Sequence, residues 1–278
     1  MTISDHVDSY AVVGNPVAHS LSPRIHAEFA EQTGQNISYR AIELAVDSFG
    51  RGIRDLQQQG FSGVNVTIPF KREAWEMCDQ RSPRATDAGA VNTLTFQADG
   101  SIVGDNTDGV GLVRDLVDNL GIAIENQRIL VLGAGGAVRG VLGPILAHSP
   151  ACIVIANRTL EKATALVRDF GSRGELDAVA YDALGPEKFD LIINGTAAGL
   201  DNEVPPLTEA VMDEGTTCYD MMYSISAATA FVDWAHSHGA GRAHDGIGML
   251  VEQAAEAFLI WRNLRPDTAA VIRSLVKS

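Results

Sequence analysis

A short glycine-rich turn, Gly133-Ala134-Gly135-Gly136-Ala137, stands between an apolar run and a helical pattern. A turn of this composition lets backbone N–H groups approach a diphosphate at the positive end of a helix. The spacing departs from a strict G-x-G-x-x-G, because Val138 occupies the position of the last glycine. Within a β-α-β unit the turn indicates a dinucleotide site, and a plain tight turn is the alternative.

The segment after the next strand indicates which dinucleotide would bind. NAD sites commonly place an acidic residue there to accept a hydrogen bond from the ribose 2′-hydroxyl. Here the chain reads Asn157-Arg158-Thr159, with Lys162 one helical turn later. Because a guanidinium donates several hydrogen bonds and stays charged, this segment predicts a clamp for a 2′-phosphate, and hence NADP. The alternative is that Arg158 and Lys162 are solvated and the segment caps a helix.

Three further polar segments could line a site. Residues 63–68 alternate, so that Asn65 and Thr67 share one strand face, and Lys71 follows as a cation. An amphipathic edge strand with a surface lysine is the alternative. The segments 104–109 and 15–23 are rich in polar residues, yet helix capping and loop structure explain them as well.

An alternating series of strands and helices must position these residues. Up to about residue 105 the pattern predicts a mixed sheet, because residues 98–100 read as a hairpin turn. Ser22 is expected as the N-cap of the first helix, with Pro23 at its first position. The expected strands are 10–14, 37–44, 61–68, 91–96 and 101–104, and the expected helices are 23–33, 48–59 and 69–79.

A second unit is expected to start near Thr107 with a helix that ends at Gly121. Apolar runs such as residues 129–132 and 152–155 suit parallel strands that are buried on both faces. Strands are expected at 128–132, 151–156, 189–194 and 216–219, and helices at 136–147, 159–170, 248–263 and 266–277.

Composition narrows the class of protein. The 278 residues carry a formal net charge of −14, which argues against binding to nucleic acid or to an anionic membrane surface. No apolar run approaches the ~20 residues that span a bilayer. The three cysteines lie far apart, as expected of buried residues in a reducing cytosol. The polar N-terminus does not resemble a secretory signal, so we expect a cytoplasmic protein.

Nine segments of the chain carry a pattern in their order and spacing: 13–23, 65–71, 89–93, 104–109, 133–137, 157–159, 194–196, 219–223 and 245–253. Together they resemble shikimate dehydrogenases along nearly the whole chain. The resemblance implies an α/β fold with a Rossmann-type NADP-binding domain at 108–246. It also implies a discontinuous α/β substrate domain with a mixed sheet, formed by 1–107 and completed by helices in 247–278.

The resemblance implies a reversible reduction of 3-dehydroshikimate to shikimate by NADPH. Lys71 and Asp108 would be the catalytic pair. A lysine ammonium can stabilise the oxygen of the reacting carbon and transfer a proton to it. We expect Lys71 to donate or relay the proton and Asp108 to orient it.

The family pattern also assigns binding residues and no metal. Ser20 and Ser22 would bind the substrate carboxylate, while His19 is kept as loop structure. Thr67, Asn92, Asp108 and Gln253 would surround the ring hydroxyls, and Tyr223 would also touch the substrate. The glycine turn, residues 157–159 and Lys162 would bind the cofactor. Met221 and Gly246 would lie near its nicotinamide.

Some positions depart from the pattern. Lys162 stands where a second arginine is common, and Pro83 where an acidic residue is common. The segment 194–199 has Gly and Ala where Ala and Ser are common, and the loop 224–231 is longer than expected. Two alternatives stay open: a quinate/shikimate dehydrogenase that prefers NAD or another ring acid, and a non-catalytic NADP-binding sensor. The protein is expected to be a monomer or a homodimer.

Overall fold

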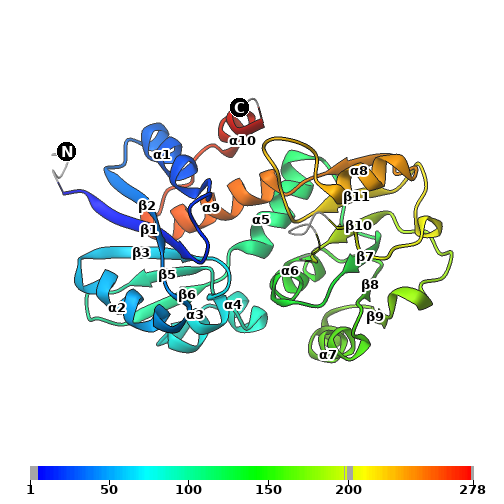
Figure 1. Cartoon of the computed structure of the whole chain (residues 1–278), viewed down its shortest axis with the longest axis horizontal. Coiled ribbons are helices and arrows are strands. Elements are labelled where there is room, and N and C mark those ends of the chain that lie inside the picture. Colours follow the sequence, from blue (N-terminus) through cyan, green and yellow to red (C-terminus); the bar gives the residue numbers. More distant parts are fainter. Residues whose placement is uncertain (1–5, 197, 199–202, 277–278) are drawn as a thin grey trace. The chain divides into compact units, whose positions relative to one another are not determined.

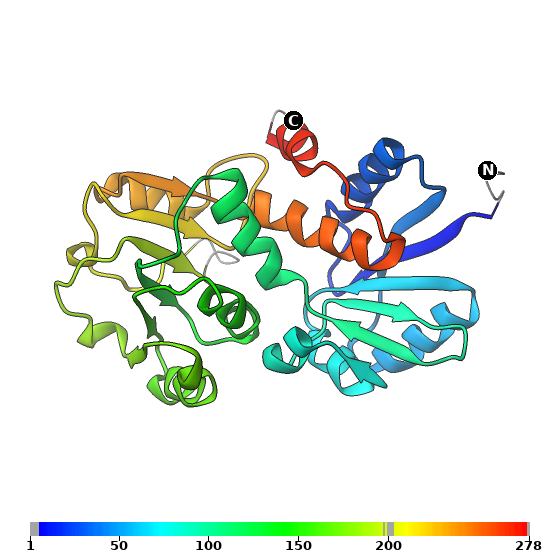
Figure 2. The same cartoon turned by 180° about the vertical axis from the view of Figure 1, so that it is seen from behind.

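Two compact units make up the chain (Figure 1 and Figure 2). The computed structural model describes residues 6–196, 198 and 203–276. Unit 1 comprises Met1–Asp108 and Val251–Arg273, and unit 2 comprises Gly109–Leu250 and Ser274–Ser278. The functional domains expected from the sequence, 1–107 with 247–278 and 108–246, stay a prediction, because they assign a ligand to each part.

The sheet of unit 1 is mixed, as expected. Its six strands follow the order β2-β1-β3-β5-β6-β4. β1 runs parallel to β2 and β3, whereas β5 runs antiparallel to both β3 and β6. The strands are β1 Asp8–Gly14, β2 Ile37–Glu43, β3 Phe61–Val66, β4 Gln80–Arg81, β5 Thr93–Phe96 and β6 Ile102–Asp105.

Helices cover both faces of this sheet. Val13 and Val64 belong to the core cluster that α2 and α3 complete, where the rings of Phe49 and Phe70 stack at 4.8 Å. On the opposite face Tyr10 stacks on Trp261 of α9 with ring centroids 4.6 Å apart. The elements are α1 Ser22–Thr33, a 3-10 turn Val46–Ser48, α2 Phe49–Gln58, α3 Lys71–Met77, α4 Pro83–Ala88, α9 Ile247–Arg262 and α10 Thr268–Val276.

The sheet of unit 2 is parallel throughout its described strands, as the apolar runs predict. Its order is β12-β11-β10-β7-β8-β9, with α6 and α7 packed on it in one core cluster. The strands are β7 Arg128–Leu132, β8 Cys152–Ala156, β9 Leu176–Val179, β10 Leu191–Asn194, β11 Thr217–Asp220 and β12 Arg242–His244.

The helical elements of unit 2 begin with α5 Asp108–Arg114, whose first residue belongs to unit 1. A π-helical turn, Asp115–Asn119, continues α5. The longer helices are α6 Gly136–Leu146, α7 Leu160–Phe170 and α8 Ala230–Ser237. Short 3-10 turns lie at Gly171–Arg173, Tyr181–Ala183 and Glu209–Val211.

One local expectation and one alternative are wrong. Ser22 is the first residue of α1 rather than its N-cap, which is Leu21. The Ser20 hydroxyl accepts from the Ser22 N–H at 3.3 Å, so a neighbouring side chain meets this orphan donor of the helix. β3 is not an edge strand, because it lies between β1 and β5. The surface-strand alternative for Asn65 and Thr67 is thereby excluded.

Candidate functional site

Lys71 and Asp108 form the centre of a polar cluster in unit 1. Lys71 is the first residue of α3, Asp108 is the first residue of α5, and Lys71 Nζ lies 2.6 Å from Asp108 Oδ2. The Asp108 side chain is 12% exposed and that of Lys71 is 30% exposed, so the ammonium reaches solvent while the carboxylate is mostly covered. The Asn106 amide oxygen accepts from the Asp108 N–H at 3.1 Å. Asp108 therefore both starts a helix and fixes a cation.

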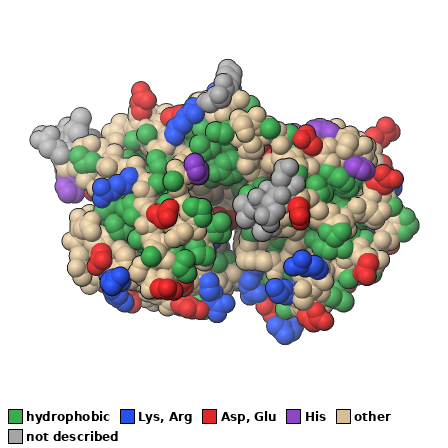
Figure 3. Space-filling view, viewed as in Figure 1, with side chains coloured by type: hydrophobic (Ala, Val, Ile, Leu, Met, Phe, Trp, Pro, Cys, Tyr) green, Lys and Arg blue, Asp and Glu red, His purple; other side chains and the backbone are tan. Residues whose placement is uncertain are grey.

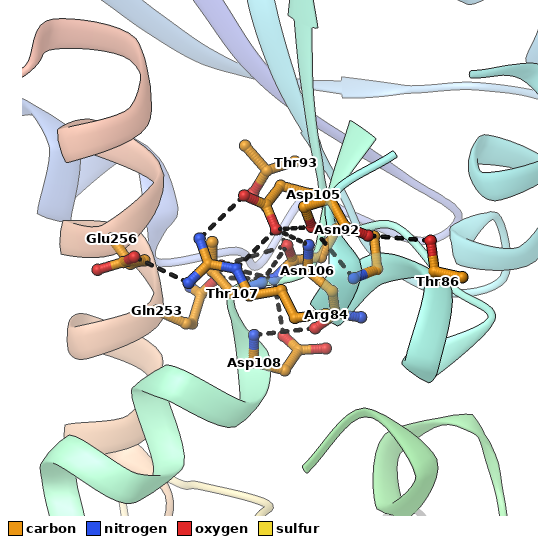
Figure 4. Close-up of polar contacts among 12 residues, drawn as sticks. Arg84, Thr86, Asn92, Thr93, Asp105, Asn106, Thr107, Asp108, Gln253 and Glu256 are labelled. Atoms are coloured by element: carbon orange, nitrogen blue, oxygen red, sulfur yellow. Dashed lines mark hydrogen bonds and ion pairs between the residues drawn. The ribbon is translucent and has the colours of Figure 1, made fainter. Parts of the chain in front are cut away.

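Asn92 joins the other members of this cluster. Its Nδ2 lies 2.8 Å from Asp108 Oδ1 and 3.3 Å from Gln253 Oε1 on α9. Its Oδ1 accepts from the Thr107 N–H at 2.9 Å. Asn92 is buried, so both ends of its amide are used inside the protein. Figure 4 shows the Asp108 carboxylate and the amides of Asn92 and Gln253 close together. The Lys71 ammonium contacts the same carboxylate, so one ammonium and two amides surround it.

Asn65 extends the polar cluster toward the start of α1. The Tyr39 hydroxyl donates to Asn65 Oδ1 at 2.8 Å, and Asn65 Nδ2 donates to Thr93 Oγ1 at 3.1 Å. Burial raises the pKa of Tyr39 well above its usual value, and a hydrogen bond with Ser22 opposes that shift. The Ser22 side chain therefore points toward the same polar face of β3, and Ser20 precedes it by two residues.

Backbone contacts hold the loop before α1 beside Thr67. The Thr67 N–H donates to the Val13 carbonyl at 2.9 Å, and the Asn15 N–H donates to the Ile68 carbonyl at 3.0 Å. Gly14 has no room for a side chain, because a Cβ there would lie 2.4 Å from Thr67 Cγ2. The chain of segment 13–15 thus passes directly against Thr67. His19 is exposed, in keeping with its interpretation as loop structure.

In unit 2 the glycine turn leads from β7 into α6. Gly133 has φ +100°, and a Cβ there would crowd the Gly195 carbonyl at 3.3 Å, so both conformation and space require glycine. Gly135 is the N-cap of α6, and Gly136 and Ala137 begin it. Gly135, Gly136 and Ala137 are exposed. The first N–H groups of an eleven-residue helix are therefore open to an anion.

Basic side chains stand at the end of the neighbouring strand, β8. Arg158 and Lys162 are exposed, and among the residues that the structure describes neither forms an ion pair. Thr159 is the N-cap of α7, yet its side chain makes no capping hydrogen bond. The Asn157 amide donates to the Thr159 carbonyl at 2.7 Å. The exposure of both cations agrees with the alternative that they are solvated, whereas the missing side-chain bond from Thr159 weighs against the capping part of that alternative. The clamp for a 2′-phosphate stays a prediction.

A buried carboxylate organises the end of β11. Asp220 accepts from Thr229 Oγ1 at 2.7 Å and from Asn194 Nδ2 at 3.0 Å. Burial raises the pKa of Asp220, and the Thr229 hydrogen bond opposes the shift. The Met221 N–H donates to the Asn194 carbonyl at 2.9 Å. These bonds fix both ends of the unusual loop 224–231, since Thr229 also caps α8.

The remaining predicted residues of unit 2 lie near this point. Gly246 donates its N–H to the Met222 carbonyl at 2.8 Å, and Met221 and Tyr223 are half-buried. A Cβ on Gly246 would lie 2.6 Å from the Met221 carbonyl oxygen. Within the segment 194–199, residues 197 and 199 lie outside the described residues.

The structure thus sorts the predicted residues into three groups. Lys71, Asn92, Asp108 and Gln253 are joined directly by hydrogen bonds. Ser20, Ser22 and Thr67 lie on adjoining segments of unit 1, while Tyr223 and the predicted cofactor residues belong to unit 2. The site selection from sequence missed Tyr39 and Asn65. The alternation of residues 63–68 marked Asn65, but nothing local marked Tyr39.

Two kinds of feature are absent from the described residues. Residues 6–196, 198 and 203–276 contain no group of three or more His, Cys, Asp or Glu side chains that could hold a metal ion. Within the same ranges every helix is too short or too polar to span a membrane.

Family models match three stretches of the chain. The model for the shikimate dehydrogenase substrate binding domain matches residues 12–94. The model described as shikimate/quinate 5-dehydrogenase matches residues 115–204, and that for the shikimate 5′-dehydrogenase C-terminal domain matches residues 246–276.

Similar proteins cover almost the whole chain. A shikimate dehydrogenase (NADP(+)) from Alkalilimnicola ehrlichii is 55% identical and covers 96% of this chain and 98% of its own length. The structure of an Ael1 enzyme from Pseudomonas putida is 45% identical, with a TM-score of 0.89 over 96% of this chain and 98% of that one. The structure of shikimate 5-dehydrogenase from Thermus thermophilus with NADP(H) and shikimate is 33% identical, with a TM-score of 0.86 over 98% and 99%. The chain belongs to the shikimate dehydrogenase family.

Proposed function

We propose that this protein catalyses the reversible NADPH-dependent reduction of 3-dehydroshikimate to shikimate. The single observation that carries the proposal is the 2.6 Å contact between Lys71 Nζ and Asp108 Oδ2, within a cluster of amides. An acid–base pair surrounded by hydrogen-bonding groups suits a hydroxyl-rich ring that exchanges a ketone for an alcohol. The 55% identity with the shikimate dehydrogenase (NADP(+)) of Alkalilimnicola ehrlichii also supports this proposal.

Lys71 and Asp108 have different tasks in this reaction. Bound NADPH supplies the hydride. Lys71 donates a proton from its ammonium group to the oxygen of the reacting carbon, and takes it back in the direction of shikimate oxidation. Asp108, held by Asn92 at 2.8 Å, keeps the ammonium group in place and stabilises its charge. The partial exposure of Lys71 leaves its ammonium able to exchange the proton with solvent.

The polar cluster of unit 1 supplies the other substrate contacts. Ser20 and Ser22 donate to the carboxylate, and their positions on adjoining segments with Thr67 support this assignment. The ring hydroxyls form hydrogen bonds with Thr67, Asn92, Gln253 and Asp108. The amides and the threonine hydroxyl in this set offer both donors and acceptors. Tyr223, on the loop after β11, completes the substrate set as a member of unit 2.

The residues of unit 2 fit NADP. The open N-terminus of α6 and the turn Gly133–Ala137 suit the diphosphate, because exposed N–H groups and the helix dipole favour an anion. Arg158 and Lys162 suit the 2′-phosphate, with Asn157 and Thr159 beside them. Met221 and Gly246 line the nicotinamide end. On this assignment residues 108–246 form the cofactor domain, and residues 1–107 with 247–278 form the substrate domain.

The chain has more acidic than basic residues, 35 against 21. On the face drawn in Figure 3, Lys and Arg side chains gather at the lower part of unit 2. With a net charge of −14, the binding of two anionic ligands rests on local donors rather than on the overall field.

We further propose that the protein acts in the cytoplasm as a monomer or a homodimer and binds neither nucleic acid nor membranes.

One assay tests the proposed function. The purified protein is given shikimate or quinate with NADP⁺ or NAD⁺, and the reduced nicotinamide is followed by its absorbance. We expect turnover with shikimate and NADP⁺, and a much smaller kcat/KM for each of the other three combinations. Equal activity with NAD⁺ would overturn the assignment of Arg158. Absence of turnover with either acid would overturn the reaction and favour an NADP-binding sensor.

A further inference from the structure

A charged network lies beside the Lys71–Asp108 pair in unit 1. Arg84 on α4 contacts the Asp105 carboxylate with two nitrogens, Nε to Oδ1 at 2.6 Å and Nη2 to Oδ2 at 2.9 Å. Its third nitrogen, Nη1, lies 2.9 Å from Glu256 Oε1 on α9. All three nitrogens of one guanidinium are therefore used, on two different segments of the chain (Figure 4).

Asp105 anchors the segment that carries Asp108. Besides Arg84, its Oδ1 accepts from the Ser82 hydroxyl at 2.5 Å and from the Asn106 N–H at 2.7 Å. Asn106 in turn donates its amide to the Ala90 carbonyl at 3.1 Å and accepts from the Asp108 N–H. The conformation of the three residues that lead to Asp108 thus depends on where the Asp105 carboxylate is held.

Glu256 anchors the helix that carries Gln253. It lies one helical turn after Gln253, and its second oxygen accepts from Arg265 Nη1 at 2.9 Å. Arg265 Nη2 also lies 2.7 Å from Glu252 Oε2, next to Gln253 in sequence. The two glutamates flank Gln253 on α9, and the guanidiniums of Arg84 and Arg265 fix both of them. The position of the Gln253 amide along the helix axis follows from these contacts.

We propose that Arg84 is a positioning residue for the substrate site, an inference that rests on the proposed function. Its guanidinium joins the turn that carries Asp108 to the helix that carries Gln253, so that both meet Asn92. The Asp105 and Glu256 side chains are only 17% and 12% exposed, which makes their shared positive partner costly to lose. A lysine at this position would keep the charge but could not reproduce the planar, three-way geometry.

The experiment compares Arg84→Lys with a matched control, Arg262→Lys. Arg262 is also a covered arginine of unit 1, and it joins α9 to Asp8 and Gln35, away from Asn92. We expect kcat/KM for shikimate to fall about tenfold to a hundredfold in Arg84→Lys, because small displacements of positioned groups are costly. The KM for NADP⁺ should stay within about twofold, as its proposed contacts lie in unit 2. In Arg262→Lys both constants should stay near those of the unaltered protein.

A second variant guards against general damage to the fold. Glu256→Gln keeps the size of the side chain and leaves the contacts between Arg84 and Asp105 intact. It should lower kcat/KM for shikimate less than Arg84→Lys does, because only the contact between Arg84 and α9 loses its negative charge. Melting temperatures of all variants show whether a kinetic change merely follows lost stability.

A double-mutant cycle with Gln253→Ala tests the route of the effect. Arg84→Lys lowers kcat/KM for shikimate by some factor in the otherwise unaltered protein. If Arg84 acts partly through α9, that factor should be at least about threefold smaller in the Gln253→Ala background. Unchanged kcat/KM for shikimate in Arg84→Lys, an equal loss in Arg262→Lys, or strictly multiplied losses in the cycle would overturn the inference. Absence of shikimate turnover in the unaltered protein would instead overturn the proposed function, and the inference with it.

Discussion

In unit 1, Lys71, Asn92, Asp108 and Gln253 hold one another through side-chain hydrogen bonds. In unit 2, the glycine turn presents backbone N–H groups, and Arg158 stands exposed with no ion pair in the described chain. The first region is therefore held together by its own side-chain contacts, whereas the second exposes hydrogen-bond donors at a helix N-terminus and on Arg158. We infer that substitutions in the first region change chemistry and substrate binding, and those in the second change cofactor binding.

The largest effect is expected from Lys71→Ala. The variant loses the proposed proton donor, so kcat for shikimate oxidation should fall by a factor of about 10² to 10⁴ while KM changes little. Steady-state kinetics with NADP⁺ measure both constants. Lys162→Ala is the matched control, because it removes a lysine from the cofactor region and should leave kcat nearly intact. A Lys71→Ala enzyme that turns over at a near-normal rate would remove Lys71 from the mechanism.

A smaller effect is expected from Arg158→Leu. Losing hydrogen bonds to the 2′-phosphate should raise the KM for NADP⁺ about tenfold to a hundredfold. The KM for NAD⁺, which lacks this phosphate, should hardly change, so the preference for NADP⁺ should largely disappear. Steady-state kinetics at saturating shikimate measure the KM values for both dinucleotides. An equal rise in both KM values would mean that Arg158 supports the fold of the turn rather than the phosphate.

The smallest effect is expected from His26, which packs against Tyr39 beside the polar cluster of unit 1. His26 is fully buried, and its ring stacks on Tyr39 with ring centroids 4.0 Å apart. Burial lowers the pKa of His26 from 6.5 to about 3, and a hydrogen bond with Asn65 opposes this shift. Between these values the unfolded chain binds a proton that the folded protein does not, so stability falls as the pH falls.

His26→Phe removes this contribution. Between pH 7 and pH 5, the unaltered protein should lose at most about 2 kcal/mol more unfolding free energy than His26→Phe does. Urea unfolding at both pH values measures the difference. His19→Phe, on the exposed loop, is the control and should keep the original pH dependence. Identical pH dependence in His26→Phe and the unaltered protein would show that His26 is not held neutral by the fold.

Sequence patterns predicted the longer strands of both sheets, from alternation such as that of residues 63–68 and from continuous apolar runs such as residues 129–132. They missed β4, α4, β9, α8 and β12, which span two to eight residues and carry too few positions for a period to show. Helix α4 had a local signal in Ser82-Pro83, and Ser82 does cap it by accepting from the Ala85 N–H. Short elements of this kind are stabilised by neighbours distant in sequence.

The candidate site shows the same division. From residue types alone, capping explained Asp108 as well as catalysis did, and only the family resemblance singled out the pair with Lys71. In the structure Asp108 begins α5 and also contacts Lys71, so the two interpretations do not exclude one another, and the catalytic one stays a proposal. The bond between Arg84 and Glu256 joins residues 172 positions apart, and no local pattern could indicate it.

Shikimate binding in the absence of cofactor tests the contrast between the two regions most directly. Calorimetry would give the Kd of shikimate for the unaltered protein, for Asn92→Ala and for Arg158→Leu, with no nicotinamide dinucleotide present. The account predicts that shikimate binds without cofactor, that Asn92→Ala weakens it about tenfold or more, and that Arg158→Leu leaves the Kd within about twofold. A Kd that is unmeasurable without NADP⁺, or that Arg158→Leu weakens as much as Asn92→Ala does, would contradict it.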